Sequence, residues 1–268
     1  MKSHTLYLEC YSGISGDMTV AALLDLGADE NVLKDGLKSL NVDGYKINIC
    51  RKQKCSFDAC DFDVILEQDP DYGPLSKEAL ALTSPEQPHI QLGHHENRNL
   101  YDINTIIDNS AITEHAKQTA KKIFLIAATA GAKAHGKSLE QIYFHEVGAV
   151  DSIVDIVSAA ICLDNLGVTE VIITELHDGT GHIKCRNGML PIPVPAVVNI
   201  VADHHIPLHI TKIKGELVTP TGASIAAAIR TRDKLPEEFK ILKTGLGAGK
   251  REYEQPAILR AMLIEEIV

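Results

Sequence analysis

Residues 6–27 run LYLECYSGISGDMTVAALLDLG, and this stretch sets the fold class that we expect. The apolar residues Leu6, Leu8 and Cys10 alternate with two more polar ones, a pattern that predicts a short, half-buried strand. A loop of glycine and serine follows, and from Asp17 to Leu26 the apolar residues recur at helical spacing. A strand that feeds a helix through a glycine-rich loop is typical of α/β proteins.

The rest of the chain continues this alternation of strands and helices. The hydrophobic spacing predicts further helices at 30–40, 102–108, 113–135, 148–166, 195–203 and 223–231, and further strands at 45–52, 57–66, 171–176, 208–218 and 258–264. We therefore expect an α/β fold, a mixed sheet with flanking helices and one long loop that bears proline and histidine. We divide the chain into a strand-loop-helix unit at 1–68, a linker at 69–98 and a second α/β unit at 99–268.

The composition of the 268 residues favours metal or proton chemistry. The 12 histidines equal the 5 Phe and 7 Tyr taken together, and Trp is absent. The net charge of −10 argues against nucleic acid or an anionic membrane as the main partner. No apolar run approaches the roughly 20 residues of a membrane span, and no signal peptide is evident. Six scattered cysteines fit free thiols in the cytoplasm.

The most informative stretch is FHEVGAVDSIVDIV, residues 144–157. Asp151 and Asp155 stand four residues apart, on one face of a helix that is apolar nearly all round. Partly buried carboxylates at this spacing repel each other by several kcal/mol, in rough terms, unless a cation compensates. His145 and Glu146 precede the helix, so the four residues are candidate metal ligands. The alternative is a structural ion pair with a lysine or arginine elsewhere.

Two strand-to-helix turns are candidates for binding a phosphate. In the first turn the candidates are Ser12, Gly13, Ser15, Gly16 and Asp17. Glycines let the backbone approach a ligand, and N–H groups at a helix start attract an anion. The Asp17 carboxylate would repel phosphate unless a divalent cation bridges the two. The alternative is an ordinary capped helix start.

The second such turn is GELVTPTGA, residues 215–223, with Glu216, Thr219, Thr221 and Gly222 as candidates. We expect Thr221 to cap the helix, and a plain capped turn is the alternative. GLGAGK at 245–250 superficially suggests a phosphate loop, but neither a helix start nor a Ser or Thr follows it, so we reject that interpretation.

A weaker metal site is possible at His94 and His95, in the proline-rich segment. Imidazole suits nickel, zinc and copper. Neighbouring residues of an extended chain point in opposite directions, so solvated histidines are the simpler interpretation.

Taken together, these motifs resemble the LarC family of nickel insertion proteins. The resemblance rests on residues 12–18, the histidine-bearing linker, HEVGAVDSIVD at 145–155, LPIPVP at 190–195 and GELVTPTGA at 215–223, in order through nearly the whole chain. It implies CTP-dependent insertion of Ni²⁺ into pyridinium-3,5-bisthiocarboxylic acid mononucleotide, with formation of carbon–nickel and sulfur–nickel bonds. It also implies Mg²⁺ or Mn²⁺ with CTP, a C-terminal LarC module and lactate racemase apoprotein as a partner.

Two features depart from the family pattern. The chain stops at Val268, before the family's C-terminal module, so we expect it to be the N-terminal part. The linker keeps only His89, His94 and His95 in place of a long histidine run. Two other functions stay open: a nickel metallochaperone or assembly subunit without catalysis, and a metal-dependent phosphohydrolase that uses Asp17 with Asp151 and Asp155.

Overall fold

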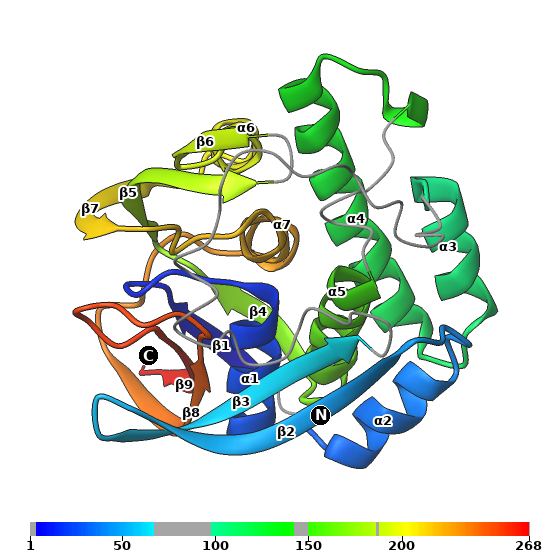
Figure 1. Ribbon diagram of the computed structural model, residues 1–268. Helices are drawn as coiled ribbons and strands as arrows, with labels where there is room; N and C mark the ends of the chain where they lie inside the picture. The colour runs from blue at the N-terminus through cyan, green and yellow to red at the C-terminus, as the bar shows by residue number, and fades with distance from the viewer. Residues whose placement is uncertain (1–3, 67–97, 142–149, 186–187, 268) are drawn as a thin grey trace, which may run out of the picture.

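The computed structural model describes residues 4–66, 98–141, 150–185 and 188–267 (Figure 1). Its helices are α1 (Gly16–Leu26), α2 (Glu30–Lys38), α3 (Leu100–Asn109), α4 (Glu114–His135), α5 (Val150–Asn165), α6 (Pro195–Asp203) and α7 (Pro220–Ile229). Its strands are β1 (His4–Glu9), β2 (Tyr45–Lys54), β3 (Phe57–Leu66), β4 (Val168–Ile172), β5 (Leu176–Cys185), β6 (Gly188–Ile192), β7 (Leu208–Lys214), β8 (Phe239–Ala248) and β9 (Ile258–Glu266).

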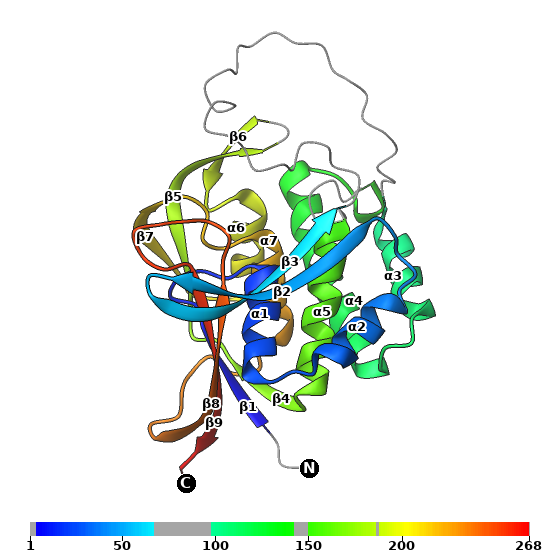
Figure 2. The same ribbon diagram turned by 60° about the horizontal axis from the view of Figure 1, so that its bottom comes forward.

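The strands form two mixed sheets. The larger has six strands in the order β2-β3-β8-β9-β1-β4, and the smaller has three in the order β6-β5-β7. In the larger sheet β1 runs parallel to β4 and antiparallel to β9, and β3 runs parallel to β8. The larger sheet thus combines strands from residues 4–66 with strands from residues 168–266, so both ends of the chain contribute to one sheet (Figure 2).

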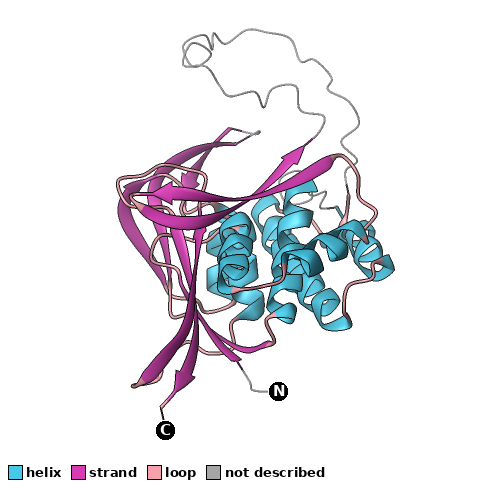
Figure 3. Ribbon diagram, turned by 90° about the horizontal axis from the view of Figure 1, so that it is seen from below, coloured by secondary structure: helices cyan, strands magenta, loops and turns pink. Residues whose placement is uncertain are grey.

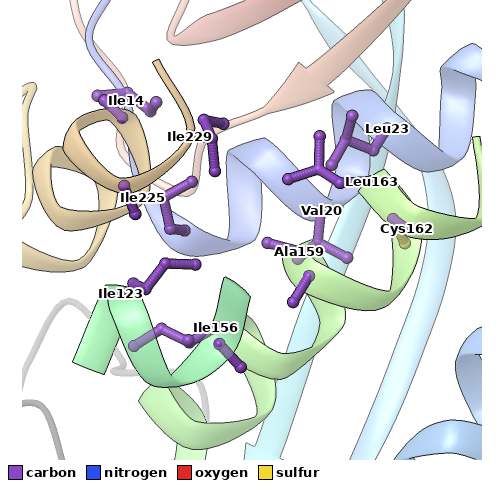
Figure 4. Packing of buried hydrophobic residues seen from close by; sticks show 14 of the residues in the cluster. Ile14, Val20, Leu23, Ile123, Ile156, Ala159, Cys162, Leu163, Ile225 and Ile229 are labelled. Atoms are coloured by element: carbon purple, nitrogen blue, oxygen red, sulfur yellow. The ribbon is translucent and has the colours of Figure 1, made fainter. Parts of the chain in front are cut away.

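The helices gather on one side of the sheets (Figure 3). Figure 4 shows the packing at the centre, where Val20 and Leu23 of α1 meet Ile156 and Leu163 of α5, with α4 and α7 close by. All four of these side chains are buried. Leu6 and Leu8 of β1 join this core, whereas Tyr7 points to a second, smaller cluster with Met262 and Ile264. The alternation in β1 therefore separates the helix-covered face of the sheet from its other face.

The structure confirms the predicted α/β fold and most of the predicted helices. The helix expected at 195–203 is α6, and Gly27 ends α1 in a left-handed conformation with φ of 117°. The predicted start of α5 at Gly148 lies outside the described residues. The six cysteines are free thiols, as expected.

Two strand predictions are wrong in part, and two strands were not predicted. The strand expected at 171–176 is divided between β4, which ends at Ile172, and β5, which begins at Leu176, because the chain crosses there from one sheet to the other. The strand expected to reach Val218 ends at Lys214, because Gly215 takes a φ of 130°. The strands β6 and β8 were not predicted at all.

Glycines conceal β8 in the sequence, and the structure shows why they are needed. A Cβ atom on Gly245 would lie 2.4 Å from the carbonyl oxygen of Ala22, and one on Gly247 would lie 2.0 Å from that of Met18. The glycines of GLGAGK therefore let β8 pack directly on the backbone of α1. This close contact, rather than a phosphate loop, accounts for the motif.

None of the helices in the described ranges is both long and apolar enough to cross a membrane.

Candidate functional site

The starts of two helices bring three predicted carboxylates together. Asp17 is the second residue of α1, and Asp151 and Asp155 lie in the first two turns of α5. The two helices meet at Gly16, where an added Cβ atom would lie 2.5 Å from Oδ2 of Asp155. Only a glycine at this position lets the Asp155 side chain lie against the start of α1. We use the name carboxylate pocket for the group of Asp17, Asp151 and Asp155, of which Asp151 is exposed and the other two are partly buried.

The described residues offer little compensation for the charges of the carboxylate pocket. Oδ1 of Asp155 is buried and has no hydrogen-bond partner in the described part of the chain. Asp17 accepts a hydrogen bond from the hydroxyl of Ser15. Among the residues that the structure describes, no lysine, arginine or histidine forms an ion pair with Asp17, Asp151 or Asp155. Buried charges without partners are costly, so this arrangement favours a bound cation.

The pKa values of these carboxyl groups are raised. Loss of hydration on burial is the main cause for Asp155, and the nearby charges of Asp17 and Asp151 add to it, so its pKa lies well above the usual value. Burial also raises the pKa of Asp17 and of Asp151, although the hydroxyl of Ser15 and the charge of Lys250 partly offset the effect at Asp17. Carboxyl groups of raised pKa that lie near one another are typical of functional sites.

The charge of Lys250 acts on Asp17 and Asp155, but its ammonium binds other carboxylates. Its Nζ lies 2.9 Å from Oδ1 of Asp61, 3.3 Å from Oδ1 of Asp63 and 2.9 Å from the carbonyl oxygen of Phe62, all on β3. Asp61 is buried, and Lys52 lies 2.7 Å from its other oxygen. Lys52 and Lys250 thus neutralise negative charge on β3. The charge of Lys250 acts on Asp17 and Asp155 only at longer range.

The two predicted phosphate turns pack against each other. The amide of Ile14 donates to the carbonyl oxygen of Leu217 at 3.0 Å, and the amide of Thr219 donates to that of Ile14 at 3.0 Å. A Cβ atom on Gly13 would lie 2.1 Å from the Leu217 oxygen, and one on Gly222 would lie 2.2 Å from the Ile14 oxygen. The glycines of both motifs are therefore required where the two turns interlock.

Several amides of these turns are already bonded within the protein. The amide of Gly13 donates to the carbonyl oxygen of Cys10 at 3.1 Å, and that of Gly222 donates to the Thr219 hydroxyl at 3.1 Å. The cap of α7 is thus Thr219, and our prediction of Thr221 is wrong because the helix begins one turn earlier, at Pro220. Ser15 is the N-cap of α1 but makes no side-chain hydrogen bond to the helix backbone.

Glu216 bonds to residues outside the carboxylate pocket. Its carboxylate pairs with Arg251 at 3.1 Å, and its carbonyl oxygen accepts from the Tyr253 hydroxyl at 2.9 Å. The neighbouring Asp178 accepts from the amides of Leu217 and Val218 at 2.9 and 3.1 Å. These bonds fix the second turn in place.

Four predicted ligands, His94, His95, His145 and Glu146, lie outside the described residues. Within the described ranges, no group of three or more histidines, cysteines, aspartates or glutamates could hold a metal ion. The carboxylate pocket therefore needs further ligands to complete a metal site.

Sequence reasoning missed Asp61, Asp63 and Lys250. The pattern DFD at 61–63, followed by the apolar residues 64–66, is the signal that could have indicated buried carboxylates. Lys250 lies almost 190 residues further on, and only the unexpected strand β8 brings it to β3.

The sequence of this chain is similar to those of known proteins. The chain matches the family described as nickel insertion protein over residues 6–267. It is 56% identical over 264 residues to a pyridinium-3,5-bisthiocarboxylic acid mononucleotide nickel insertion protein of Alkaliphilus metalliredigens, with 98% of this chain and 61% of the relative covered. Proteins of the same name from Acetivibrio thermocellus and Geobacillus kaustophilus are 42% and 40% identical, with 96% and 97% of this chain and 60% of each relative covered.

The chain thus spans about three fifths of the length of these curated relatives. No solved structure matches it.

Proposed function

Because the chain belongs to the nickel insertion protein family, we propose that it takes part in inserting nickel into pyridinium-3,5-bisthiocarboxylic acid mononucleotide, the compound in its relatives' name. The chain corresponds to about three fifths of those relatives. Our proposal therefore assigns it the nickel-holding part of the reaction.

One observation carries this proposal. Asp155 presents a buried carboxylate oxygen without a hydrogen-bond partner in the described chain, directly beside Asp17 and Asp151. A divalent cation would compensate the neighbouring charges of these carboxylates, with which no described basic residue forms an ion pair. Ni²⁺ accepts carboxylate and imidazole ligands, so His145 and Glu146, which precede α5 in the chain, are the ligands that we propose to complete the site.

The raised pKa of these carboxyl groups suits the chemistry of the proposed reaction. When Ni²⁺ forms a bond to a ring carbon of the pyridinium, it replaces the hydrogen of that carbon, which leaves as a proton. A carboxylate of raised pKa accepts a proton more readily than an exposed one. We assign this role to Asp17 or Asp155, acting through a carboxylate oxygen that is not bound to nickel.

The nucleotide part of the substrate needs donors for its phosphate. The turn before α1, with Ser12, Gly13, Ser15 and Gly16, and the start of α7, with Thr219, Thr221 and Gly222, are the positions that we propose for it. The amides of Gly13 and Gly222 already donate within the protein, so the proposed donors are other amides and hydroxyls of these turns. Glu216 would act indirectly, by fixing the turn before α7 through Arg251.

The remaining parts of the reaction are proposals drawn from the family. We propose that the chain is a nickel chelatase of the lyase class, that CTP with Mg²⁺ or Mn²⁺ and the C-terminal module of the relatives are required for full activity, and that lactate racemase apoprotein receives the product. His94 and His95 would be an accessory place for nickel.

Nickel titration calorimetry of the untagged protein tests the proposal. We expect Asp155→Asn and Asp17→Asn each to weaken nickel binding at the tightest site at least tenfold, because each removes one negative ligand and keeps the shape of the side chain. The matched control is Asp203→Asn, an exposed carboxylate on α6 that pairs with Lys133. Tightest-site affinities that are unchanged in both pocket variants would contradict the proposal.

A cofactor assay separates insertion from simple delivery of nickel. The chain is mixed with nickel, the mononucleotide and CTP, with and without the C-terminal part of a relative. Formation of the nickelated product only in the complete mixture supports an insertion enzyme in two parts. Tight nickel binding without product in either mixture would favour the metallochaperone.

A further inference from the structure

The strand β5 touches the backbone of the turn at 215–219, which precedes α7. The pairing of β5 with β7 loses its regular register between Asp178 and Thr180. A Cβ atom on Gly179, between them, would lie 1.9 Å from the carbonyl oxygen of Gly215 and 2.8 Å from that of Ile213. The amide of Gly215 also donates to the carbonyl oxygen of Thr180 at 3.0 Å. A glycine is therefore needed where β5 meets this turn.

Asp178 is fully buried and is bonded to the same turn. Its Oδ1 atom accepts hydrogen bonds from the amides of Gly179 at 2.7 Å, Leu217 at 2.9 Å and Val218 at 3.1 Å. Its Oδ2 atom has no hydrogen-bond partner among the described residues. In the described part of the chain, the hydrogen bonds of this side chain therefore all come from backbone amides at the contact between β5 and the turn.

The residues that Asp178 holds also hold the turn at 12–16, which precedes α1. The carbonyl oxygen of Leu217 accepts from the amide of Ile14 at 3.0 Å, and Val218 forms a parallel bridge with Ile14. The amide of Thr219 donates to the carbonyl oxygen of Ile14 at 3.0 Å. A continuous series of hydrogen bonds thus runs from one buried carboxylate oxygen through the second turn to the first.

We propose that Asp178 is a positioning residue for the substrate: by fixing Leu217 and Val218, it sets how the two turns that receive the mononucleotide phosphate lie relative to each other. The proposal rests on the proposed function, which assigns the phosphate to these turns. Asp178 acts through the turns, because it is buried behind them. The contact of Gly16 with Asp155 joins α1 to α5 and does not pass through Asp178. We therefore expect Asp178 to affect binding of the mononucleotide more than binding of nickel.

Calorimetric titration of the mononucleotide into the nickel-free protein tests this role. Asp178→Ala removes the acceptor of buried amides and is expected to weaken binding at least about tenfold. Asp178→Asn keeps an oxygen that can accept from the same amides, so its affinity is expected to stay within about threefold of wild type. The matched control is Thr231→Ala, which removes the acceptor of the Val171 amide, 2.8 Å away, beyond the opposite end of α7, and should leave the affinity unchanged.

Nickel titration of the same variants separates positioning from a general loosening of the protein. Asp178→Ala is expected to bind nickel at the tightest site within about threefold of wild type. Circular dichroism checks that each variant is folded. If Asp178→Ala is not folded, Asp178→Ser takes its place with the same expected loss, because a serine hydroxyl is too short to accept from all of these amides.

The outcomes distinguish this proposal from the proposed function. The positioning role is overturned if the folded Asp178→Ala or Asp178→Ser variant binds the mononucleotide as tightly as wild type. It is also overturned if Thr231→Ala weakens binding equally, or if nickel affinity falls as much as mononucleotide affinity. Wild-type protein that does not bind the mononucleotide at all would instead contradict the placement of the substrate in the proposed function, and the positioning role with it.

Discussion

Asp155 combines a functional advantage with a cost in stability. Burial and the neighbouring carboxylates raise its pKa in the folded protein above that of the unfolded chain, near 3.9. The folded state is therefore penalised as the pH rises above the unfolded pKa, and the penalty vanishes below it. We predict that Asp155→Asn stabilises the metal-free protein at pH 7 by about 1 kcal/mol, as is common when a functional site is neutralised.

Thermal unfolding of the metal-free protein between pH 4 and pH 7 checks this prediction. The gain in Tm from Asp155→Asn should grow with pH across this range. The control Asp203→Asn, at an exposed carboxylate, should change Tm little at either pH. An Asp155→Asn variant that is less stable than wild type at pH 7 would show that the carboxylate stabilises the fold.

Asp61 should show the opposite pH dependence. Burial alone would raise its pKa, but hydrogen bonds from Lys52 and Lys250 outweigh burial and lower it. Its contribution to stability is therefore present above the unfolded pKa, near 3.9, and is lost as the pH falls through the lower folded value. We predict that the stability difference between wild type and Asp61→Asn shrinks below about pH 4. A difference that is constant from pH 7 to pH 3 would contradict this.

Gly16 is the residue that lets the two helix starts meet. A Cβ atom there would lie 2.5 Å from Oδ2 and 2.8 Å from Cβ of Asp155, so Gly16→Ala should destabilise the protein by about 1–3 kcal/mol. In contrast, Gly131 lies within α4 with nothing within 4 Å of an added Cβ, so Gly131→Ala should stabilise by about 0.5–1 kcal/mol. Denaturant unfolding compares the two. Equal effects of the two substitutions on the free energy of unfolding would mean that the Asp155 side chain moves away from an added Cβ atom at no cost.

Part of the candidate site could be predicted at the residue scale. Asp151 and Asp155 were recognisable because two charges at helical spacing stood in an apolar sequence. Lys250 and Asp61 were not, because their pairing depends on strands that are distant in the chain and on a register that local patterns do not fix.

At the scale of elements, the helices were predictable and the glycine-rich strand was not. α6 and α4 carry regular apolar spacing, and α4 also has a threonine cap and a C-terminal glycine, so their bounds were found within one residue. β8 has glycines at alternate positions where a strand usually has β-branched residues. Its glycines are needed for the close contact with α1. A contact between distant parts of the chain does not show in the local sequence pattern.

The contact between β8 and α1 gives a prediction that ranks two substitutions. Gly247→Ala places a Cβ atom 2.0 Å from the Met18 carbonyl oxygen, which belongs to the backbone and cannot rotate away. Gly249→Ala meets side-chain atoms of Met18 and Ala257 at 3.0 and 3.1 Å, and the long Met18 side chain can adjust. We expect Gly247→Ala to cost about 3 kcal/mol or more, at the upper end for overpacking, and Gly249→Ala clearly less. Chemical denaturation measures both, and a reversed order would contradict the packing argument.

The whole molecule depends on strands from both sides of residues 67–97. β1 lies between β9 and β4, and β3 pairs with β8, so residues 4–66 and 98–267 share a sheet and a core. We predict that a chain cut at an engineered protease site within 67–97 still elutes as one particle in size-exclusion chromatography. Fragments that separate without denaturant would instead support two independent units at 1–68 and 99–268.

The central claim is that nickel is held between the starts of α1 and α5. Anomalous diffraction at the nickel absorption edge, from crystals grown with one equivalent of Ni²⁺, tests it most directly. The predicted result is an anomalous peak within coordination distance of the Asp155 carboxylate, beside Asp17 and Asp151. Anomalous peaks confined to other parts of the molecule, with none at Asp155, would contradict the claim.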